Sequence, residues 1–470
     1  YTLTLSSGNH DYTVTPKVLN LSGSKVYDGT NAVLAAELTT HTGLIGSETV
    51  TLSGATTTTG SGGANKNVAN DVGITANASG ITVANGSNGG LATNYTLTGG
   101  THETDITKQD FSIALSRQYD ATNQAKPNSA DSAITETFSG LVGTETLTLG
   151  GTNGTVSNAN ATGSAQAVTI GGLTVGNGSG ASASSGGLIA NYNLTGTTLT
   201  ISPRVLTSSG SRFYDGTTTA SNSDITLGNL ANSQTLALSG AGTTSSKNVG
   251  SYSLSNLSGA SIADGTGSAS NYTLTGGTHS FTISRKAVNI TGTKSYDGNT
   301  NMSSSTITNI TNTVNTETLT MASGTGTTSS ANVASYSGGD TAAGSLSLGN
   351  GTNGGLAANY TLSGGTQAYN ITKKVLSSSG SRVYDGTTNA NNSDLALSGL
   401  VGTQTLTFSG AGTLGDANVA SNKSVTLNTL SIADGSNGGL AGNYTLSGGT
   451  HQLTVSRRPV NVSGTRLYNA

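Results

Sequence analysis

The feature that most constrains this chain is a short motif, Tyr-Asp-Gly-Thr, which recurs along its whole length. Three copies depart from it: Ala121 replaces the glycine in one, Asn299 replaces the threonine in another, and Asn469 follows the tyrosine in the last, where the given sequence ends. Successive motif tyrosines are 82 (296 minus 214) to 95 (214 minus 119) residues apart. A long internal period of this kind predicts a tandem array of similar units. The six motif tyrosines are Tyr27, Tyr119, Tyr214, Tyr296, Tyr384 and Tyr468.

A second motif, Asn-Tyr, precedes each of the later Tyr-Asp motifs at a nearly constant distance. The two tyrosines are separated by 22 (214 minus 192) to 24 (119 minus 95) residues, so we expect this segment to join one repeat to the next. The Asn-Tyr tyrosines are Tyr95, Tyr192, Tyr272, Tyr360 and Tyr444. The predicted boundaries are 1–16 for the closing strands of a preceding repeat, 17–107 for repeat 1, 108–202 for repeat 2, 203–284 for repeat 3, 285–372 for repeat 4, 373–456 for repeat 5, and 457–470 for the opening strand of a following repeat.

Alternation of apolar residues with threonine predicts β-strands in every repeat. The segment 145–149, Glu-Thr-Leu-Thr-Leu, is typical, since a period of two places leucine on a buried face and threonine on an exposed one. We therefore expect an all-β fold, an elongated tandem array of small β-sandwich-like modules that are Ig-like or β-grasp-like. A continuous β-solenoid is the alternative, but its rungs repeat at about 20 to 30 residues, and no such short period is present.

Composition excludes several classes of function. The chain has no cysteine, which removes disulfides, thiolate metal sites and thiol nucleophiles. Its formal net charge is −3, so we expect no nucleic-acid partner. No apolar run approaches the roughly 20 residues that a transmembrane helix needs.

The tyrosines of both motifs are predicted to be structural anchors. Aromatic residues are only 4% of the chain, so their concentration in two motifs indicates that each module is built around a tyrosine pair. The alternative is an aromatic platform that binds sugars. The predicted anchors are Tyr27, Asp28, Gly29, Tyr95, Tyr119, Asp120, Tyr192, Tyr214, Asp215, Gly216, Tyr272, Tyr296, Asp297, Gly298, Tyr360, Tyr384, Asp385, Gly386, Tyr444 and Tyr468.

A basic residue stands two positions before each Tyr-Asp tyrosine. We expect its stem to lie over the tyrosine ring and the motif aspartate to pair with a basic group at the junction between modules. A row of cationic collars that bind acidic polysaccharide is the alternative. These basic residues are Lys25, Arg117, Arg212, Lys294, Arg382 and Arg466.

No residues with a catalytic pattern stand out. Histidine follows the last turn of several repeats, but Gln367 takes its place in repeat 4, and a general base cannot be absent from one copy of a site. Asp264 and Asp434 lie in glycine-rich hairpins that faintly resemble calcium loops without their repeated acidic ligands. We therefore predict no catalytic, cofactor-binding or metal-binding residues, and no enzyme.

Three motifs in a fixed order, Lys/Arg-x-Tyr-Asp-Gly-Thr, Asn-Val and Asn-Tyr-Thr-Leu, give the chain a resemblance to a known family. It resembles the YDG-type and mostly-β glycine-rich (MBG) repeats of bacterial surface exoproteins similar to filamentous haemagglutinin. The resemblance implies an extracellular, Gram-negative stalk that an outer-membrane partner exports through a separate secretion domain.

The expected function is a non-enzymatic structural region of a large bacterial adhesin or matrix protein, in a stalk or fibre. Its expected partners are the neighbouring repeats of the same chain. The alternative is that the repeats themselves bind glycans or a protein, or that copies assemble laterally or by strand exchange into a filament.

Overall fold

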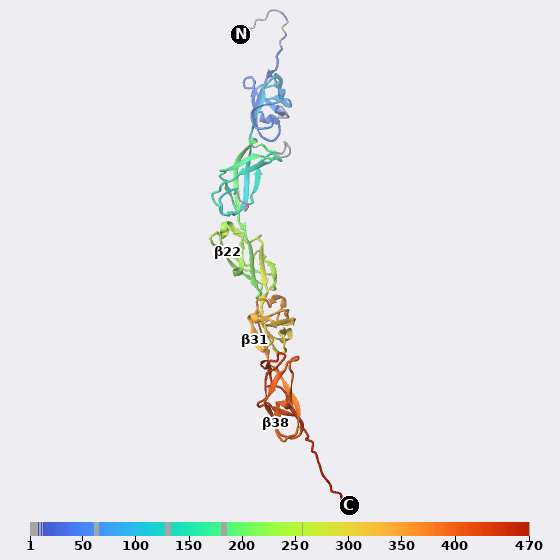
Figure 1. Ribbon diagram of the computed structural model, residues 1–470. Helices are drawn as coiled ribbons and strands as arrows, with labels where there is room; N and C mark the ends of the chain where they lie inside the picture. Colours follow the sequence, from blue (N-terminus) through green and yellow to red (C-terminus); the bar gives the residue numbers. More distant parts are fainter. Residues whose placement is uncertain are drawn as a thin grey trace. The chain divides into compact units, whose positions relative to one another are not determined.

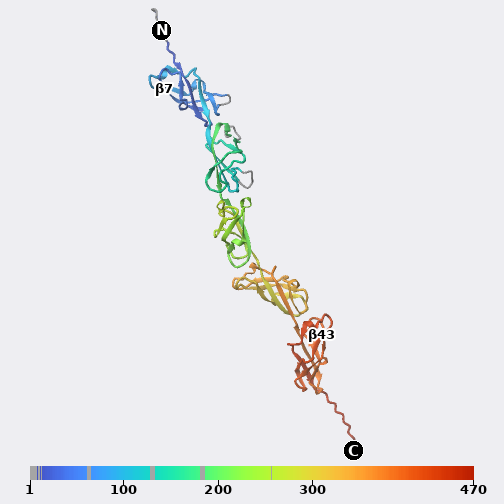
Figure 2. The ribbon, with the colours of Figure 1, turned by 90° about the vertical axis from the view of Figure 1, so that its left-hand side faces the viewer.

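A computed structural model of the chain describes residues 8, 11, 13–60, 65–126, 133–179, 186–255 and 257–469. These residues belong to two compact units, and repeat 3 contributes to both of them. Unit 1 consists of Tyr1–Ser208, Leu227–Ser239 and Ala260–Thr278; unit 2 consists of Ser209–Thr226, Gly240–Gly259 and His279–Ala470. In Figures 1 and 2 the strands of each repeat form a group with its own range of colours.

Repeat 1, in unit 1, folds into two small sheets around one core. The main sheet has the order β4-β2-β9-β6, in which β2 and β9 run parallel and both edge strands are antiparallel to their neighbours. The second sheet, β3-β5-β7, is antiparallel, and a short parallel pair joins β1 to β8. The strands are β1 (Lys17–Val18), β2 (Asn20–Val26), β3 (Ala32–Leu34), β4 (Thr40–Thr42), β5 (Val50–Thr57), β6 (Ala69–Gly73), β7 (Ile81–Asn85), β8 (Tyr95–Thr96) and β9 (His102–Thr107).

Repeat 2, also in unit 1, has the same arrangement around a longer central pair. Its main sheet has the order β11-β10-β15-β13, with β10 and β15 parallel, and β12 pairs with β14. Phe111, Ile113 and Leu115 alternate with less buried residues along β10, as a strand with one face in the core requires. The strands are β10 (Gln109–Gln118), β11 (Thr135–Ser139), β12 (Leu147–Gly151), β13 (Ala165–Ala167), β14 (Leu173–Asn177) and β15 (Tyr192–Ser202).

Repeat 3 supplies strands to both units. In unit 1, β16 pairs in parallel with β23; in unit 2, β21 pairs antiparallel with β24. Its strands are β16 (Arg204–Val205), β17 (Thr207–Phe213), β18 (Thr219–Ser221), β19 (Ile225–Gly228), β20 (Leu236–Thr243), β21 (Gly250–Ser253), β22 (Ala260–Asp264), β23 (Tyr272–Thr273) and β24 (His279–Ser284).

Repeat 4 lies in unit 2 and has the main sheet β28-β26-β35-β31, again with a parallel central pair. Its strands are β25 (Lys286–Ala287), β26 (Asn289–Ser295), β27 (Asn301–Ser303), β28 (Ile307–Thr311), β29 (Leu319–Ser323), β30 (Thr325–Thr328), β31 (Ala334–Ser337), β32 (Thr341–Ala342), β33 (Ser347–Asn350), β34 (Tyr360–Thr361) and β35 (Gln367–Thr372).

In repeat 5 the two sheets are continuous, because β41 pairs with β42 and gives the order β38-β41-β42-β45-β37-β39. The parallel pair is β37 with β45. The strands are β36 (Lys374–Val375), β37 (Ser377–Val383), β38 (Asn389–Asn391), β39 (Leu395–Ser398), β40 (Leu406–Ser409), β41 (Ala411–Leu414), β42 (Ala420–Thr426), β43 (Ser431–Asp434), β44 (Tyr444–Thr445) and β45 (His451–Ser456).

The predicted all-β class is confirmed. In the described residues the helical elements are short 3-10 turns, and none has the length and apolar character needed to cross a bilayer. Five of these turns end just before the Asn-Tyr tyrosine and set its position: η3 (Ala92–Asn94), η4 (Ile189–Asn191), η7 (Ala269–Asn271), η10 (Ala357–Asn359) and η12 (Ala441–Asn443). The parallel central pair distinguishes these modules from an immunoglobulin sandwich, whose sheets are antiparallel.

The two terminal segments differ from the rest. Residues 457–469, predicted as an opening strand, are exposed and form no strand. In each repeat the opening strand pairs with a closing strand some 70 to 85 residues later, for example Leu21 with His102, and the sequence ends before such a partner. The predicted closing strands at 1–16 lie largely outside the described residues, and Gly8, Asp11 and 13–16 form no strand.

Candidate functional site

The most distinctive site in the chain is the joint between consecutive repeats. Tyr27 of repeat 1 is only 2% exposed because its ring lies in repeat 2, with its centroid 5.6 Å from that of Tyr192 in an edge-to-face arrangement. The same contact recurs at the next three joints, with centroid separations of 5.3 to 5.4 Å. These pairs are Tyr119 with Tyr272, Tyr214 with Tyr360, and Tyr296 with Tyr444. Each joint lies within one of the two units.

A single side chain connects the two hydroxyl groups of each tyrosine pair. In repeat 2 this bridging residue is Glu145, which accepts hydrogen bonds of 2.6 Å from Tyr27 and from Tyr192, one on each carboxylate oxygen. Tyr192 in turn accepts a 3.0 Å bond from the backbone N–H of Val142. Glu317 of repeat 4 makes the equivalent bonds to Tyr214 and Tyr360, at 2.7 and 2.6 Å.

Glutamine is the bridging residue at the other two joints. Gln234 donates from Nε2 to the Tyr119 hydroxyl at 3.1 Å and accepts on Oε1 from the Tyr272 hydroxyl. Gln404 bridges Tyr296 and Tyr444 in the same way. An amide can donate to one phenol and accept from the other, so these joints satisfy both hydroxyls without a buried charge.

The glutamate joints favour the neutral form of their tyrosines. Burial raises the pKa of Tyr192 to about 12, and the hydrogen bond to Glu145 contributes in the same direction. Burial and the bond to Glu317 likewise raise the pKa of Tyr214 to about 12. The pKa values of Tyr27 and Tyr360 are raised for the same reasons. A phenolate would lose its role as donor and would face a carboxylate.

A pair of asparagines forms a second contact across each joint. Asn191, which precedes Tyr192, accepts a 3.0 Å bond from the backbone N–H of Val68 in repeat 1 and donates to Asn67 at 2.9 Å. Asn271, Asn359 and Asn443 make the corresponding bonds to loops of repeats 2, 3 and 4. The Asn-Val loop of one repeat, which is Asn160-Ala161 in repeat 2, therefore binds the Asn-Tyr motif of the next.

The basic residue before each motif holds the Tyr-Asp-Gly turn from within its own repeat. Lys25 pairs with Asp28 at 2.9 Å and donates to the backbone carbonyl of Thr30. Arg117 and Lys294 pair with their own aspartates at 2.6 Å. Arg212 and Arg382 do the same with Asp215 and Asp385, and the side chains of all five basic residues are at most 8% exposed.

This burial corrects two predictions. The aspartate does not pair with a basic group at the junction; its partner stands three positions earlier in its own turn. A row of exposed cationic collars is also wrong for these five positions, because the charged heads point into the turn.

The predicted tyrosine anchors need a correction as well. Tyr27, Tyr119, Tyr214 and Tyr296 are buried, which contradicts a sugar-binding platform, but each fills a space in the following repeat and not in its own. Tyr384 has no following repeat in the described chain and is 39% exposed, so it is not a core anchor of repeat 5. Tyr468 is 91% exposed.

Repeat 1 and repeat 5 each present one half of a joint that no other described repeat covers. On repeat 1, Tyr95 donates to the bridging residue Glu48 and accepts from the backbone N–H of Ile45 at 3.1 Å, while Asn94 is exposed. On repeat 5, Tyr384 and Val419 are exposed, whereas their counterparts in earlier repeats are covered. The geometry of a joint thus forms within a single repeat, before its partner is in place.

The histidines in the described part of the chain, at positions 41, 102, 279 and 451, all make interactions. His102 accepts a 3.2 Å bond on Nδ1 from the Leu21 N–H, and its Nε2 lies 2.9 Å from the carbonyl oxygen of Leu97. Gln367 makes the analogous bond to the carbonyl of Leu362, which explains how an amide replaces the ring in repeat 4. Asp264 accepts from the backbone N–H of Ala269, a role that Asn85 fills in repeat 1 for Ala92.

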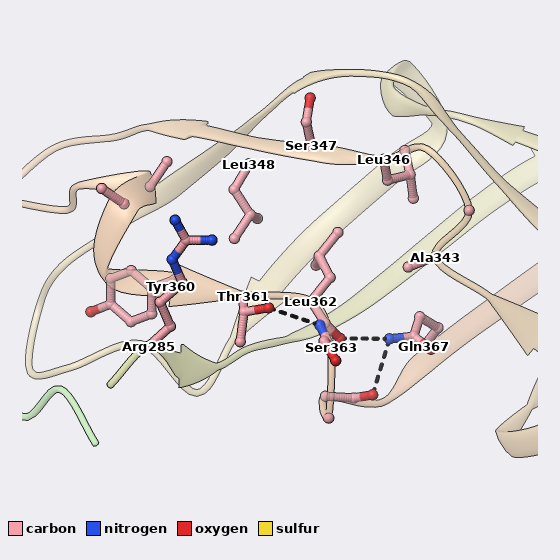
Figure 3. A pocket seen from close by; sticks show the side chains of 15 residues that line it. Arg285, Ala343, Leu346, Ser347, Leu348, Tyr360, Thr361, Leu362, Ser363 and Gln367 are labelled. Carbon is pink, nitrogen blue, oxygen red and sulfur yellow. Dashed lines mark hydrogen bonds between the residues drawn. The ribbon is translucent and has the colours of Figure 1, made fainter. Parts of the chain in front are cut away.

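A shallow hollow lies beside the Asn-Tyr strand. In repeat 4 it measures about 660 Å³ and is lined by residues that include Arg285, Leu346, Tyr360 and Gln367 (Figure 3). Figure 3 shows Gln367 held by bonds to the main chain, including one of 3.0 Å to Gly365. An equivalent hollow of about 490 Å³ is present in repeat 5, with Lys373 at the position of Arg285.

Two components of the joint were not predicted from the sequence. The sequence predicts the bridging residue only as the start of a strand, and it assigns no role to the asparagine of the Asn-Tyr motif. The sequence does carry a signal for the first: Glu or Gln recurs at one position in every repeat, although charged residues are only 9% of the chain. The bridging residues are Glu48, Glu145, Gln234, Glu317 and Gln404.

Comparison with known families agrees with the repeated architecture. No curated protein matches the chain. The YDG domain matches at residues 12–104, 197–280 and 366–452, more than half of the chain. The unmatched stretches contain most of repeats 2 and 4, which carry Ala121 and Asn299 in their motifs yet form the same tyrosine joints. With three such matches in one array, the chain belongs to the YDG domain family.

Proposed function

We propose that this chain is a non-enzymatic structural repeat region of a large extracellular bacterial protein, where it forms a stalk or fibre that holds an adhesive element away from the cell surface. The observation that carries the proposal is the joint. The Tyr-Asp tyrosine of each of repeats 1 to 4 packs in the next repeat, where the hydroxyl group is hydrogen-bonded by a glutamate or glutamine.

Several properties of the chain support this function. The joints bury aromatic rings, hydrogen-bond their hydroxyls and pair asparagines on a second face, so rotation between neighbours would break several contacts at once. The surface is rich in threonine, serine, asparagine and glycine, with few charges. Such a composition suits a spacer, whose task is to set a distance.

The test is made in the producing organism. A tag is placed at the end of the protein far from its membrane attachment, and its distance from the cell surface is measured by immunogold electron microscopy. Removal of 108–284, which takes out repeats 2 and 3, should bring the label closer to the cell. A label inside the cell, or at an unchanged distance, would contradict the proposal.

The recurring hollow favours one alternative, in which the repeats bind glycans. Part of the lining is apolar and a basic side chain stands at the rim, a combination suited to a sugar ring carrying an acidic group. Glycan-array binding by the chain, abolished in Arg285→Ala together with Lys373→Ala, would support this alternative. A spacer should give the same background signal before and after the substitutions.

A further inference from the structure

The glycine of the Tyr-Asp-Gly turn faces one particular side chain of the next repeat. Gly29 has a φ of +78°, and a Cβ added to it would lie 3.0 Å from Cγ1 of Val142. A Cβ on Gly216 would lie 3.0 Å from Cγ1 of Val314, and one on Gly298 would lie 2.8 Å from Cγ1 of Val401. At three of the four joints the absent Cβ therefore makes room for a valine methyl.

The joint between repeats 2 and 3 differs on both sides. Ala121 stands at the glycine position, with a φ of 65°, so its Cβ occupies the space that the other joints leave empty. The residue at the valine position of repeat 3 is Ala231, which has no γ carbon. Both alanines belong to one continuous core cluster. The extra carbon on one repeat is thus matched by the loss of two methyl groups on the other.

We propose that this pair of positions determines which repeats can be neighbours. A repeat with glycine after its Tyr-Asp motif fits a following repeat that has valine at the position of Val142. A repeat with alanine after this motif fits a following repeat that has alanine at that position. Other combinations are mismatched. Ala against Val forces two carbons to about 3 Å, which a packed and partly buried valine cannot relieve without moving its loop. Gly against Ala leaves a void in the joint.

The residues that select a neighbour are different from the residues that hold neighbouring repeats together. The tyrosine pair, the bridging residue and the asparagine pair occur at Gly–Val and at Ala–Ala joints alike, so they hold any two repeats together without distinguishing them. The uncovered face of repeat 1 has Ile45 at the valine position, 54% exposed. By the same rule this face accepts a repeat with Gly in its turn and rejects one with Ala.

The test is a double-substitution cycle in the full chain, read by hydrogen–deuterium exchange. Ala231→Val brings the clash into the second joint, and valine is compatible with this loop because three other repeats carry it. One amide reports on the joint, the Ala161 N–H of repeat 2, which bonds to Asn271 of repeat 3. We expect its exchange to accelerate at least tenfold, and to return to within threefold of wild type when Ala121→Gly is added.

The other joints serve as controls within the same molecule. The amides of Val68, Val249 and Val333 make the equivalent cross-joint bonds and should exchange at unchanged rates. The reciprocal pair tests the rule in the opposite direction: Gly29→Ala should accelerate exchange at Val68, and Val142→Ala should restore it. If Ala231→Val has no effect, or if Ala121→Gly does not reverse it, the two positions do not select neighbours and the proposal is overturned.

Discussion

At the scale of single residues, the contacts of the Tyr-Asp tyrosine explain why this position holds tyrosine and not phenylalanine. The ring fills an apolar space in the next repeat, while the hydroxyl reaches a bridging residue that also holds a second tyrosine. Phenylalanine would fill the same space but leave one oxygen or amide of the bridging residue without its bond. Leaving a buried polar group unpaired costs about 1 to 3 kcal/mol, more when it is charged.

The glutamate joints should be sensitive to alkaline pH. The folded joint favours the neutral phenol, so this stabilisation is complete below the ordinary tyrosine pKa of about 10 and is lost as the pH rises through about 12, the raised pKa of Tyr192. Glu145→Gln removes the neighbouring carboxylate and should therefore shift part of the tyrosine absorbance titration at 295 nm to lower pH. An identical titration curve would show that Glu145 does not hold these phenols.

Two chemically identical substitutions separate a covered tyrosine from an uncovered one. Tyr296→Ala removes a buried ring from the joint with repeat 5 and should weaken it by about 3 to 5 kcal/mol. Hydrogen exchange at the cross-joint amide of Val333 measures the loss. Tyr384→Ala is the matched control, since its ring is largely exposed. It should leave the unfolding of repeat 5 within about 1 kcal/mol of wild type. Equal effects of the two substitutions would contradict the role of Tyr296 in stabilising the joint.

At the scale of elements, the strand before each motif and the turn itself act as one part. β26 ends at Ser295, and Lys294 then ties the turn together through Asp297 and the backbone carbonyl of Asn299. These contacts of Lys294 fix the direction in which the Tyr296 side chain points out of repeat 4. The aspartate contributes too, as the Thr387 N–H and the Arg382 guanidinium lower the pKa of Asp385 to about 2 in repeat 5.

Removing the buried cation should loosen the turn and the joint together. Lys294→Met keeps the length of the stem but leaves the carbonyl of Asn299 and the carboxylate of Asp297 without this donor, a loss of about 1 to 3 kcal/mol. Faster exchange at Val333 in repeat 4 is the expected result. Lys423→Met is the control: it breaks an ion pair with Asp416, and Asp416 is largely exposed. If Lys423→Met accelerated exchange at Val333 more than Lys294→Met does, the contacts of Lys294 would not be what stabilises the joint.

The sequence predicted the repeat, the strands and the two tyrosines, but it could not indicate which tyrosines meet. A tandem period is equally compatible with Tyr27 packing on Tyr95 in its own repeat or on Tyr192 in the next, because both partners recur with the same spacing. The decision depends on where β2 ends relative to the core, which is a matter of three-dimensional packing. The basic residue was misjudged for a related reason, since low overall charge gives no sign that the few charged side chains are buried.

At the scale of the whole molecule, the sequence predicts an elongated array, and this stays a prediction for small-angle scattering. The described joints lead us to expect that Tyr119→Ala, which removes one ring from the second joint, increases the range of interdomain distances without unfolding any repeat. Circular dichroism would verify that the strands persist. A scattering curve of a single compact particle, already in the wild type, would refute the elongated array.

The parallel pairing of β2 with β9 has a consequence for a chain under tension. The chain enters repeat 1 through β1, continues directly into β2 and leaves at the end of β9, and β2 and β9 are in register from Leu21 with His102 to Val26 with Thr107. A pull on both ends would slide these strands along each other, so all six paired positions would share the load at once. An antiparallel hairpin pulled from its open end would release its bonds one at a time. Because β26 with β35 and β37 with β45 repeat this pairing, repeats 4 and 5 would also yield in shear when pulled at both ends.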